Sequence, residues 1–367
     1  MFSMADQHDP HKHRLARLLR QIHFRGVDAL LVTHLADVRY LCGFTGSSAV
    51  LVLTRDAGAI FFSDGRYTEQ ARAEILDRAE IVIAGAPVVR ALEWCTQHRT
   101  RKLGLDFAHL TVSSFRELEQ RLGRRVRLED CSGVVEALRM IKDAEEIARI
   151  RAAANLGAGL FDVALQSTRP GVRESEVAAE MEYEARRRGA EAMSFETIVA
   201  GGPRSALPHG RASGERLPQR GFVVVDFGVI LTGYCSDMTR TVHLGKADAR
   251  EQHMYDAVLR AQLAALNKIR PGIAVSAVDA AARETLDHAG YGKFFTHSTG
   301  HGVGIEIHEP PRLAGKQRRK LRAGMVITVE PGVYIPGEGG IRIEDMVLVT
   351  ERGSEVLTPT TKKLITI

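Results

Sequence analysis

The chain has 367 residues, of which 44% are hydrophobic and 26% charged, and its formal net charge is +5. This composition excludes wholesale disorder, and the length allows two domains with cores of their own. The basic residues are scattered apart from short runs at 186–188 and 318–320, so we expect solvated faces and no nucleic-acid partner.

The cysteines and the N-terminus indicate the compartment. The four cysteines are far apart and form no CxxC pair, which is typical of free thiols in a reducing compartment rather than of a disulfide framework or a zinc knuckle. The first 14 residues are polar and lack the apolar region of a secretory signal. No run approaches the ~20 apolar residues of a membrane span. We therefore expect a soluble cytoplasmic protein without a membrane partner.

The first third of the chain predicts a small α/β domain. A tail of about 12 residues comes first, and in this region we expect exposed histidines at His8, His11 and His13. Strands are predicted at 28–33, 49–54, 59–64, 80–85 and 102–107, and they alternate with helices near 13–25, 67–77, 88–98 and 114–122. We place the boundary after residue 138, because Asp143 and Glu146 form a capping pair that begins a long helix.

The remaining residues, 139–367, contain an internal duplication. Arg169-Pro170-Gly171 and Arg270-Pro271-Gly272 each break a helical stretch, and they lie 101 residues apart. His209 and His308 lie 99 residues apart, and each precedes a glycine that opens an acid-bearing strand. One repeat is too few for a solenoid. We instead expect two halves, each a helix pair with a curved antiparallel hairpin, to close face to face so that their acids converge.

The first hairpin spans 222–243 and carries two acids on strands that are otherwise hydrophobic. Asp226 and Asp237 are equidistant from the midpoint between Leu231 and Thr232, so a symmetric hairpin sets the two acids opposite each other. Like charges opposed across two strands are destabilising unless a cation lies between them.

The second hairpin spans 327–349 and repeats this arrangement. Glu330 and Glu344 are equidistant from Gly337, in the middle of a turn rich in proline and glycine. Four carboxylates on hydrophobic strands make a poor core and a good cage for hard divalent cations. Two divalent ions would balance the four charges, and ions ~3.5–4 Å apart can activate a water and polarise a carbonyl or phosphoryl oxygen. The pattern therefore predicts a site for two metal ions.

Histidines supply the candidate nitrogen ligands. The segment 294–311 holds His297, His301 and His308, and His301 lies between two glycines, where the backbone can approach a metal closely. His297 and His301 could instead stack on a helix surface, although the interleaved glycines argue against a helix. His308 could equally be a strand histidine, and His209 a polar loop residue.

Two further candidates also have ordinary alternatives. Arg342 lies between two isoleucines and two residues before Glu344, so it could be a structural ion-pair partner. An isolated acid such as Asp226 would be a metal ligand only about one time in ten. The duplication and the order of these acids and histidines, taken as a set, favour the metal site.

The order of short motifs along the chain resembles the pita-bread metallopeptidases, in particular the branch of Xaa-Pro aminopeptidases and prolidases. The motifs are LPHG (207–210), VVVDFG (223–228), SDMTRT (236–241), THSTGHGVG (296–304), HEPP (308–311), VEPGVY (329–334) and RIEDMV (342–347). Members also carry an N-terminal α/β domain with segments like GFTGSS (43–48) and DGRY (64–67). The resemblance implies a creatinase-like α/β domain over 1–138 and an α+β pita-bread catalytic domain over 139–367.

Carried over by position, the resemblance implies five metal ligands: Asp226, Asp237, His301, Glu330 and Glu344. Of these, Asp237 and Glu344 would bridge both ions. The residues implied around the substrate are His209, His297 and His308, and Arg342 would orient ligands. The implied reaction is hydrolysis of the bond between an N-terminal residue and a following proline, a tertiary amide without an N–H. Glu330 would carry the proton to the leaving nitrogen, and His308 or His209 would stabilise the oxyanion.

The cofactors, partners and substrate class follow from the same resemblance and ligand set. Four carboxylates and one imidazole suit Mn²⁺ or Co²⁺ and would also accept Zn²⁺. The resemblance implies a homodimer. A prolidase would bind the free carboxylate of proline with a cation, for which Arg211 and Arg312 are candidates, whereas an aminopeptidase leaves that space open. We favour the Xaa-Pro aminopeptidase, because no basic cluster in the catalytic half is committed to a carboxylate.

Three other interpretations share the fold. A creatinase-like amidinohydrolase works without metal and lacks this ligand set, and a methionine aminopeptidase generally lacks the N-terminal domain. A non-enzymatic binding module, as in some histone chaperones, is expected to have lost ligands. A metal analysis separates these classes, since two ions per chain favour the peptidase and none would favour the creatinase or the binding module.

Overall fold

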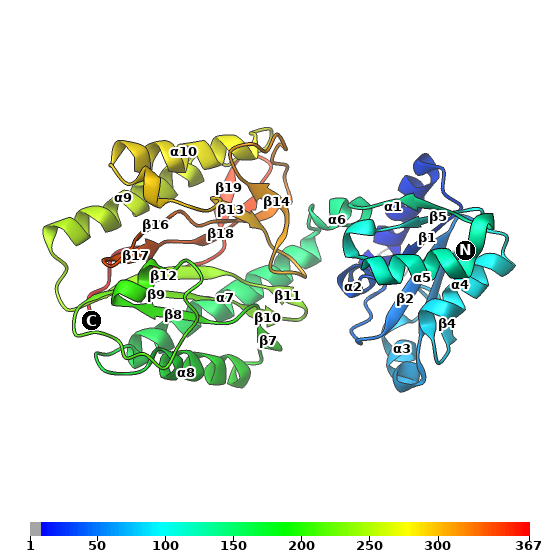
Figure 1. The fold of residues 1–367 in the computed structure, drawn as a ribbon, viewed down its shortest axis with the longest axis horizontal. Coiled ribbons are helices and arrows are strands. Elements are labelled where there is room, and N and C mark those ends of the chain that lie inside the picture. Colours follow the sequence, from blue (N-terminus) through cyan, green and yellow to red (C-terminus); the bar gives the residue numbers. More distant parts are fainter. Residues whose placement is uncertain (1–8) are drawn as a thin grey trace. The chain divides into compact units, whose positions relative to one another are not determined.

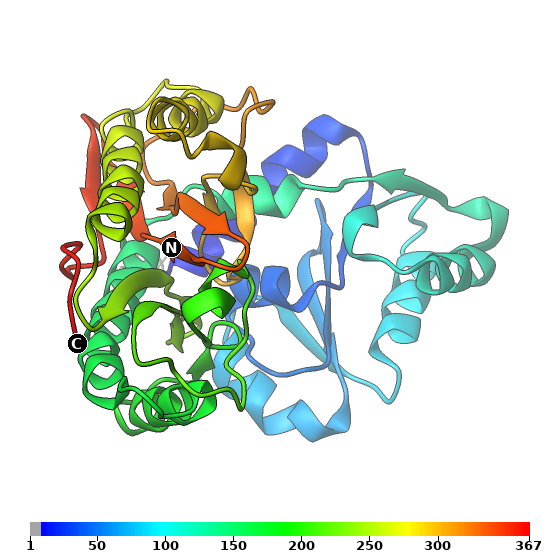
Figure 2. The same cartoon turned by 60° about the vertical axis from the view of Figure 1, so that its left-hand side comes forward.

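The computed structural model describes residues 9–367, apart from the side chains of residues 23 and 24. The chain divides into two compact units, one that ends at Arg139 and one that runs from Met140 to Ile367 (Figures 1 and 2). Among the described residues, no helix combines the length and the apolar character needed to cross a lipid bilayer. The four cysteines are free, as predicted, and the structure shows that all of them are buried: Cys42, Cys95, Cys131 and Cys235.

The N-terminal unit is a six-stranded sheet with helices on its faces (Figure 1). Its strands are β1 Ala29–Val32, β2 Ala49–Thr54, β3 Gly58–Ser63, β4 Glu80–Ile83, β5 Lys102–Leu105 and β6 Arg127–Asp130. Its helices are α1 Pro10–Arg25, α2 Leu35–Cys42, α3 Thr68–Ile75, α4 Pro87–Gln97, α5 Val112–Leu122 and α6 Val134–Arg139. The order is β4-β3-β2-β1-β5-β6, with β1, β5 and β6 parallel. This arrangement confirms the predicted α/β class.

Three elements of this unit, α2, β6 and α6, were not predicted, because tertiary contacts define them. α2 is short, and the carboxylate of Asp37 in its first turn is buried against the guanidinium of Arg139 at 2.7 Å. β6 reads Arg-Leu-Glu-Asp and lies at the edge of the sheet, parallel to β5. Charged residues suit an edge strand, but they hide the hydrophobic signal by which a strand is predicted.

The predicted exposure of the N-terminal histidines holds at His13 and fails at His11, whereas His8 lies outside the described residues. α1 already begins at Pro10, and the Nδ1 atom of His11 lies 3.0 Å from the carbonyl oxygen of Tyr40. Burial lowers the pKa of the His11 imidazole to about 4. The prediction of an exposed tail residue is therefore wrong at this position.

The strands of the second unit form several small sheets, among them β12-β9-β8 and β14-β13-β15-β18-β19 (Figure 2). A three-stranded sheet, β11-β10-β7, and a two-stranded one, β16-β17, accompany them. The bounds are β7 Ala192–Met193, β8 Ile198–Gly201, β9 Gly221–Phe227, β10 Val229–Leu231, β11 Tyr234–Cys235, β12 Met238–Leu244, β13 Gly300–Gly302, β14 Glu309–Leu313, β15 Val326–Val329, β16 Gly332–Ile335, β17 Gly339–Arg342, β18 Asp345–Val349 and β19 Ser354–Val356.

Two helix pairs cover these strands, one pair for each half of the duplication. They are α7 Ala144–Ser167 with α8 Glu174–Arg187, and α9 Ala249–Leu266 with α10 Val275–His288. α7 and α8 share a buried apolar cluster with β9 and β12, whereas α9 and α10 share one with β15 to β18. Capping boxes at Asp143 and Asp248 begin α7 and α9, so the two halves also repeat this local signal.

The register of the first hairpin differs from the prediction. Its turn is Thr232-Gly233, and the positive φ angles of 47° and 79° close a two-residue loop between β10 and β11. Asp226 consequently pairs with Thr239 and not with Asp237. The predicted midpoint was one residue too early, so the two acids are offset along the strands instead of directly opposed.

The second hairpin has the predicted register. Val329 pairs with Asp345, and Gly332 pairs with Arg342, so both pairs are symmetric about residue 337. Glu330 and Glu344 have the same centre of symmetry, and they therefore lie opposite each other where β15 and β18 pass into β16 and β17.

The two halves join beside these acids. The backbone N–H of Glu344 donates to the carbonyl oxygen of Thr239 at 3.1 Å, and the Thr241 hydroxyl donates to the carbonyl oxygen of Arg342 at 2.9 Å. This seam places β12 of the first hairpin next to the acid-bearing strands of the second. The convergence of the acids therefore follows from the way in which the duplicated halves pack.

A buried ionic network supports the seam from the side of the C-terminal tail. The Asp345 carboxylate accepts hydrogen bonds from Arg240 at 2.8 Å, Gln262 at 2.8 Å, Thr358 at 2.7 Å and Lys362 at 2.6 Å. Despite burial, which acts in the opposite direction, the cations Arg240 and Lys362 lower the pKa of Asp345. Asp345 therefore stays ionised and ties β18 to β12 and to the tail.

We predict that Asp345→Asn destabilises the second unit by about 3–5 kcal/mol, because the guanidinium of Arg240 would remain buried without its counter-charge. The free energy of unfolding in urea measures this effect. Arg187→Ala removes an ion pair with Glu184 whose arginine side chain is 63% exposed, and it should cost less than about 1 kcal/mol. Equal losses of unfolding free energy in the two variants would contradict the role assigned to the Asp345 network.

Candidate active site

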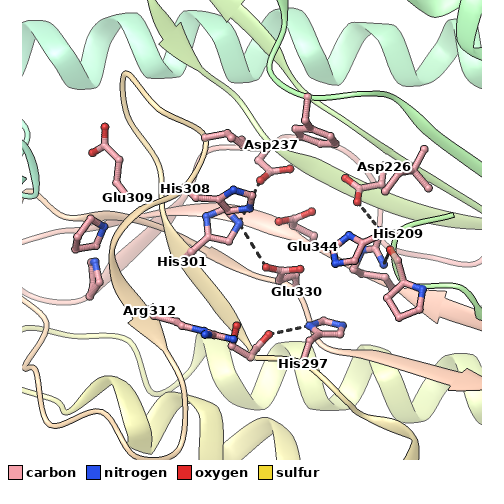
Figure 3. Close-up of a pocket in the computed structure, with 18 of the residues that line it drawn as sticks. His209, Asp226, Asp237, His297, His301, His308, Glu309, Arg312, Glu330 and Glu344 are labelled. Atoms are coloured by element: carbon pink, nitrogen blue, oxygen red, sulfur yellow. Dashed lines mark hydrogen bonds and ion pairs between the residues drawn. The ribbon is translucent and has the colours of Figure 1, made fainter. Parts of the chain in front are cut away.

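A cavity of about 920 Å³ in the second unit brings together all nine residues that the sequence analysis selected (Figure 3). They are His209, Asp226, Asp237, His297, His301, His308, Glu330, Arg342 and Glu344. The two candidate cations, Arg211 and Arg312, line the same cavity. A duplicated sequence pattern has thus predicted a spatial cluster whose members are up to 135 residues apart in the chain.

The acids and His301 lie at strand ends around the seam. Asp226 is on β9, Asp237 precedes β12, and Glu330 and Glu344 lie between consecutive strands of the second hairpin. One ligand atom from each of Asp237, His301 and Glu344 lies within 4.8 Å of the other two. The Nε2 atom of His301 is 3.6 Å from Asp237 Oδ2 and 3.5 Å from Glu330 Oε1.

The glycines beside His301 allow neighbouring strands to pack closely against β13. A Cβ atom on Gly300 would lie 2.0 Å from the carbonyl oxygen of Thr328, and one on Gly302 would lie 2.4 Å from the carbonyl oxygen of Pro310. Neither site has room for a side chain, because β14 and β15 flank β13 on both sides. The expectation that these glycines let the backbone approach a metal closely stays a prediction.

The electrostatics of the cluster favour the binding of a cation. Burial raises the pKa of Asp237 and of Glu344 well above the ordinary range, and the neighbouring carboxylates add to this effect. Burial also raises the pKa of Glu330 to about 7. Arg342 partly offsets the repulsion, but a single guanidinium cannot balance four carboxylates.

The protonation of His301 shows where a cation fits. Burial lowers the pKa of His301 to about 4, so the ring is neutral at neutral pH. Its Nδ1 atom lies 3.0 Å from the carbonyl oxygen of Gly302, which assigns the single ring proton to Nδ1. The lone pair of Nε2 then faces the oxygens of Asp237 and Glu330, and ionised carboxylates and this lone pair attract one another when a cation lies between them. The residues present therefore fit a metal centre.

Arg342 binds several neighbouring groups on one wall of the cavity. It forms an ion pair with Asp226, and it donates to the Tyr334 hydroxyl at 2.6 Å and to the carbonyl oxygen of Pro208 at 3.1 Å. The Tyr334 hydroxyl lies 2.9 Å from His297 Nε2, and burial raises the pKa of Tyr334 to about 12. A hydrogen-bonded chain thus runs from Asp226 to His297.

The structure adds residues that the sequence analysis did not select. Tyr334 is the centre of the chain just described, and the Thr239 hydroxyl donates to Glu344 Oε2 at 2.7 Å. Both residues occur in motifs quoted above, VEPGVY and SDMTRT. The alternation of side chains along a strand is the signal that could have revealed Thr239. In the observed register, Thr239 pairs across the strands with Asp226, so the two side chains lie on the same face of the sheet.

His209 and His308 are more exposed than the acids. The ring of His308 lies 4.4 Å from that of His301, at an angle of 65°, and burial lowers the pKa of His308. His209 follows Pro208, whose carbonyl oxygen is bound by Arg342. Both imidazoles line the cavity, where they can reach a molecule bound against the acids.

We predict that the stability of the metal-free protein falls as pH rises from about 4.5 to about 7. Glu330 has a pKa of about 7 in the folded state against 4.5 for an ordinary glutamate, so the folded state binds the extra proton within this window. Melting temperatures of chelator-treated protein between pH 5 and 8 test this. Glu330→Gln should make the slope shallower, and the rest of it should persist because Asp237 and Glu344 also have raised pKa values. An unchanged slope in Glu330→Gln would contradict the prediction.

Two family models match the chain. Residues 148–351 match metallopeptidase family M24, and residues 14–141 match the creatinase/prolidase N-terminal domain. The Xaa-Pro dipeptidase of Pyrococcus furiosus is 36% identical over 364 residues, which cover 96% of this chain and 100% of the relative.

Solved structures agree with these matches. The Xaa-Pro dipeptidase from Bacillus anthracis has a TM-score of 0.93 and 40% identity, over 97% of this chain and 100% of that one. The X-Pro aminopeptidase from Thermotoga maritima has a TM-score of 0.88 and 34% identity, over 96% of this chain and 100% of that one. The predicted combination of an N-terminal α/β domain with a pita-bread catalytic domain is confirmed. The chain therefore belongs to metallopeptidase family M24 and carries a creatinase/prolidase N-terminal domain.

Proposed function

We propose that this protein is a prolidase, an Xaa-Pro dipeptidase that hydrolyses the bond between an N-terminal residue and a C-terminal proline. The observation that carries the proposal is the combination, in one cavity, of a buried acid cluster with an arginine suited to a substrate carboxylate. The names of relatives with complete coverage, from Pyrococcus furiosus and Bacillus anthracis, support the same substrate class.

The acid cluster would hold two divalent ions through Asp226, Asp237, His301, Glu330 and Glu344. When bound, such ions polarise the scissile carbonyl and lower the pKa of a water. The mainly hard oxygen ligands favour Mn²⁺ or Co²⁺, and Zn²⁺ would also be accepted. The Nε2 atom of His301 lies 3.5–3.6 Å from one oxygen of Asp237 and one of Glu330, and this position supports the proposed ligand set.

The remaining side chains would move protons and orient the substrate. Glu330, with a pKa of about 7 before any ion binds, would accept the proton of the attacking water and return it to the proline nitrogen. His308 or His209 would donate to the developing oxyanion from the mouth of the cavity. Arg342 and Tyr334 would hold Asp226 and His297 in place through the chain of contacts described above.

Arg312 is the reason to revise the substrate class. The sequence alone favoured an aminopeptidase, because no cation was visibly committed to a carboxylate. Arg211 pairs with Glu196 at 2.7 Å, whereas Arg312 has no ion-pair partner within the described residues. Arg312 also lies near enough to His301 for its charge to contribute to the low pKa of that ring, after burial. A planar guanidinium there would bind the free carboxylate of proline.

Further features of the proposal concern the whole chain. We assign residues 1–138 to the creatinase-like domain and 139–367 to the catalytic domain. We also propose a cytoplasmic homodimer, because the family resemblance implies a dimer and the free thiols suit a reducing compartment. Sedimentation as a monomer at micromolar concentration would contradict the dimer.

We predict that Arg312→Ala lowers kcat/KM for an Xaa-Pro dipeptide about 10- to 100-fold. This is the effect expected when one charge-assisted hydrogen-bonded pair with the substrate is lost. The same variant should barely change the slow hydrolysis of the dipeptide amide, which has no carboxylate to bind. Arg211→Ala is the matched control, and it should have a much smaller effect. Equal cleavage of the dipeptide, its amide and an Xaa-Pro-Xaa tripeptide by the unaltered protein would show an aminopeptidase instead.

We predict that Asp237→Asn removes at least one bound ion and nearly all peptidase activity while the fold is retained. Metal content after equilibration with Mn²⁺, measured together with turnover and circular dichroism, tests this. Asp162→Asn, on the exposed face of α7, is the control and should change neither quantity. Two bound ions and full turnover in Asp237→Asn would refute the assignment of this ligand.

A further inference from the structure

A second group of titratable side chains lies in the N-terminal unit, and it shares no residue with the candidate active site of the second unit. β1, β5 and β6 are parallel, so their carboxyl ends share one edge of the sheet. Asp106 directly follows β5, and His109 ends the short 3₁₀ turn Phe107–His109 that comes next. Glu136 approaches this turn from α6. In open α/β sheets, ligands bind preferentially at such an edge.

The geometry of the group suits a metal ion. One ligand atom from each of Asp106, His109 and Glu136 lies within 4.8 Å of the other two. His109 Nε2 is 3.2 Å from Glu136 Oε1, close to the ~3.3 Å that separates two ligands of tetrahedral zinc at bond lengths of 2.0–2.1 Å. The ring of His34 stacks on that of His109 at 3.7 Å and 10°, which orients the imidazole.

The charge of the surroundings is negative. Three carboxylates lie together here, those of Asp37, Asp106 and Glu136, and the nearby guanidinium of Arg139 binds Asp37 at 2.7 Å. Burial raises the pKa of Glu136, and Asp37 and Asp106 add to this. The Oε2 atom of Glu136 is inaccessible to solvent and has no hydrogen-bond partner. A buried carboxylate oxygen without a partner is costly, and a cation would remove that cost.

We propose that Asp106, His109 and Glu136 bind one divalent transition-metal ion, with Zn²⁺ as the reference ion. The site is separate from the acid cluster of the catalytic unit and does not depend on the function proposed for that cluster. One imidazole and two carboxylates match the ligands that Zn²⁺ takes from proteins. The His109 side chain is 30% exposed, so water can reach the remaining coordination positions and the ion can enter. The bound ion would link the turn after β5 to α6.

Equilibrium dialysis of the full chain against Zn²⁺, with the metal counted per chain, tests the proposal. His109→Ala and Glu136→Gln should each bind one Zn²⁺ fewer than the unaltered protein. His13→Ala is the matched control, because His13 is an exposed histidine on α1 of the same unit, and it should bind the full number. The same number of ions in all four proteins would overturn the proposal.

The double variants with Asp237→Asn separate this site from the catalytic cluster. If the proposal is correct, the difference of one Zn²⁺ between His109→Ala and His13→Ala persists in that background, whatever happens to the catalytic ions. Glu136→Gln preserves the size of the side chain, so it keeps the test valid if His109→Ala folds poorly. A plain ion pair between His109 and Glu136 would give no difference in zinc content, and this outcome refutes the site.

Discussion

The mutual repulsion of buried carboxylates is the constraint on which the catalytic unit depends. Asp237 and Glu344 are almost fully enclosed, and burial together with the neighbouring acids raises the pKa of both. Protonation relieves the repulsion only by neutralising the ligands, whereas divalent ions relieve it and keep them charged. His301 is neutral and turns its Nε2 lone pair towards two of the acids, which is consistent with the binding of divalent ions.

The duplication is what makes this concentration of charge feasible. Each half contributes a hairpin with two acids and a helix pair that buries the outer face of that hairpin. The seam between the halves is held by backbone hydrogen bonds, by the Thr239–Glu344 contact and by the Asp345 network. These contacts are independent of any ion, so the fold can present the acids before metal binds.

Much of this arrangement was predictable from the sequence, because it rests on local signals. The register of the second hairpin followed from symmetry about Gly337. The predicted register of the first hairpin was wrong, because the turn is Thr232-Gly233 and its centre lies one residue later than predicted. The Thr-Gly dipeptide itself is recognisable in the sequence. Tyr334, α2 and β6 depend on tertiary contacts that no periodicity reveals. Likewise, only the structure shows that Arg211 is paired with Glu196 whereas Arg312 faces the cavity without an ion pair in the described chain.

Anomalous scattering from crystals grown with Mn²⁺ would test the metal assignment most directly. We predict two peaks ~3.5–4 Å apart among the four acids. Asp237 and Glu344 should each contact both ions, Asp226 one of them, and His301 and Glu330 the other. A single peak, or ions that leave Asp237 or Glu344 without a contact, would contradict the two-ion centre from which the proposed hydrolysis is argued.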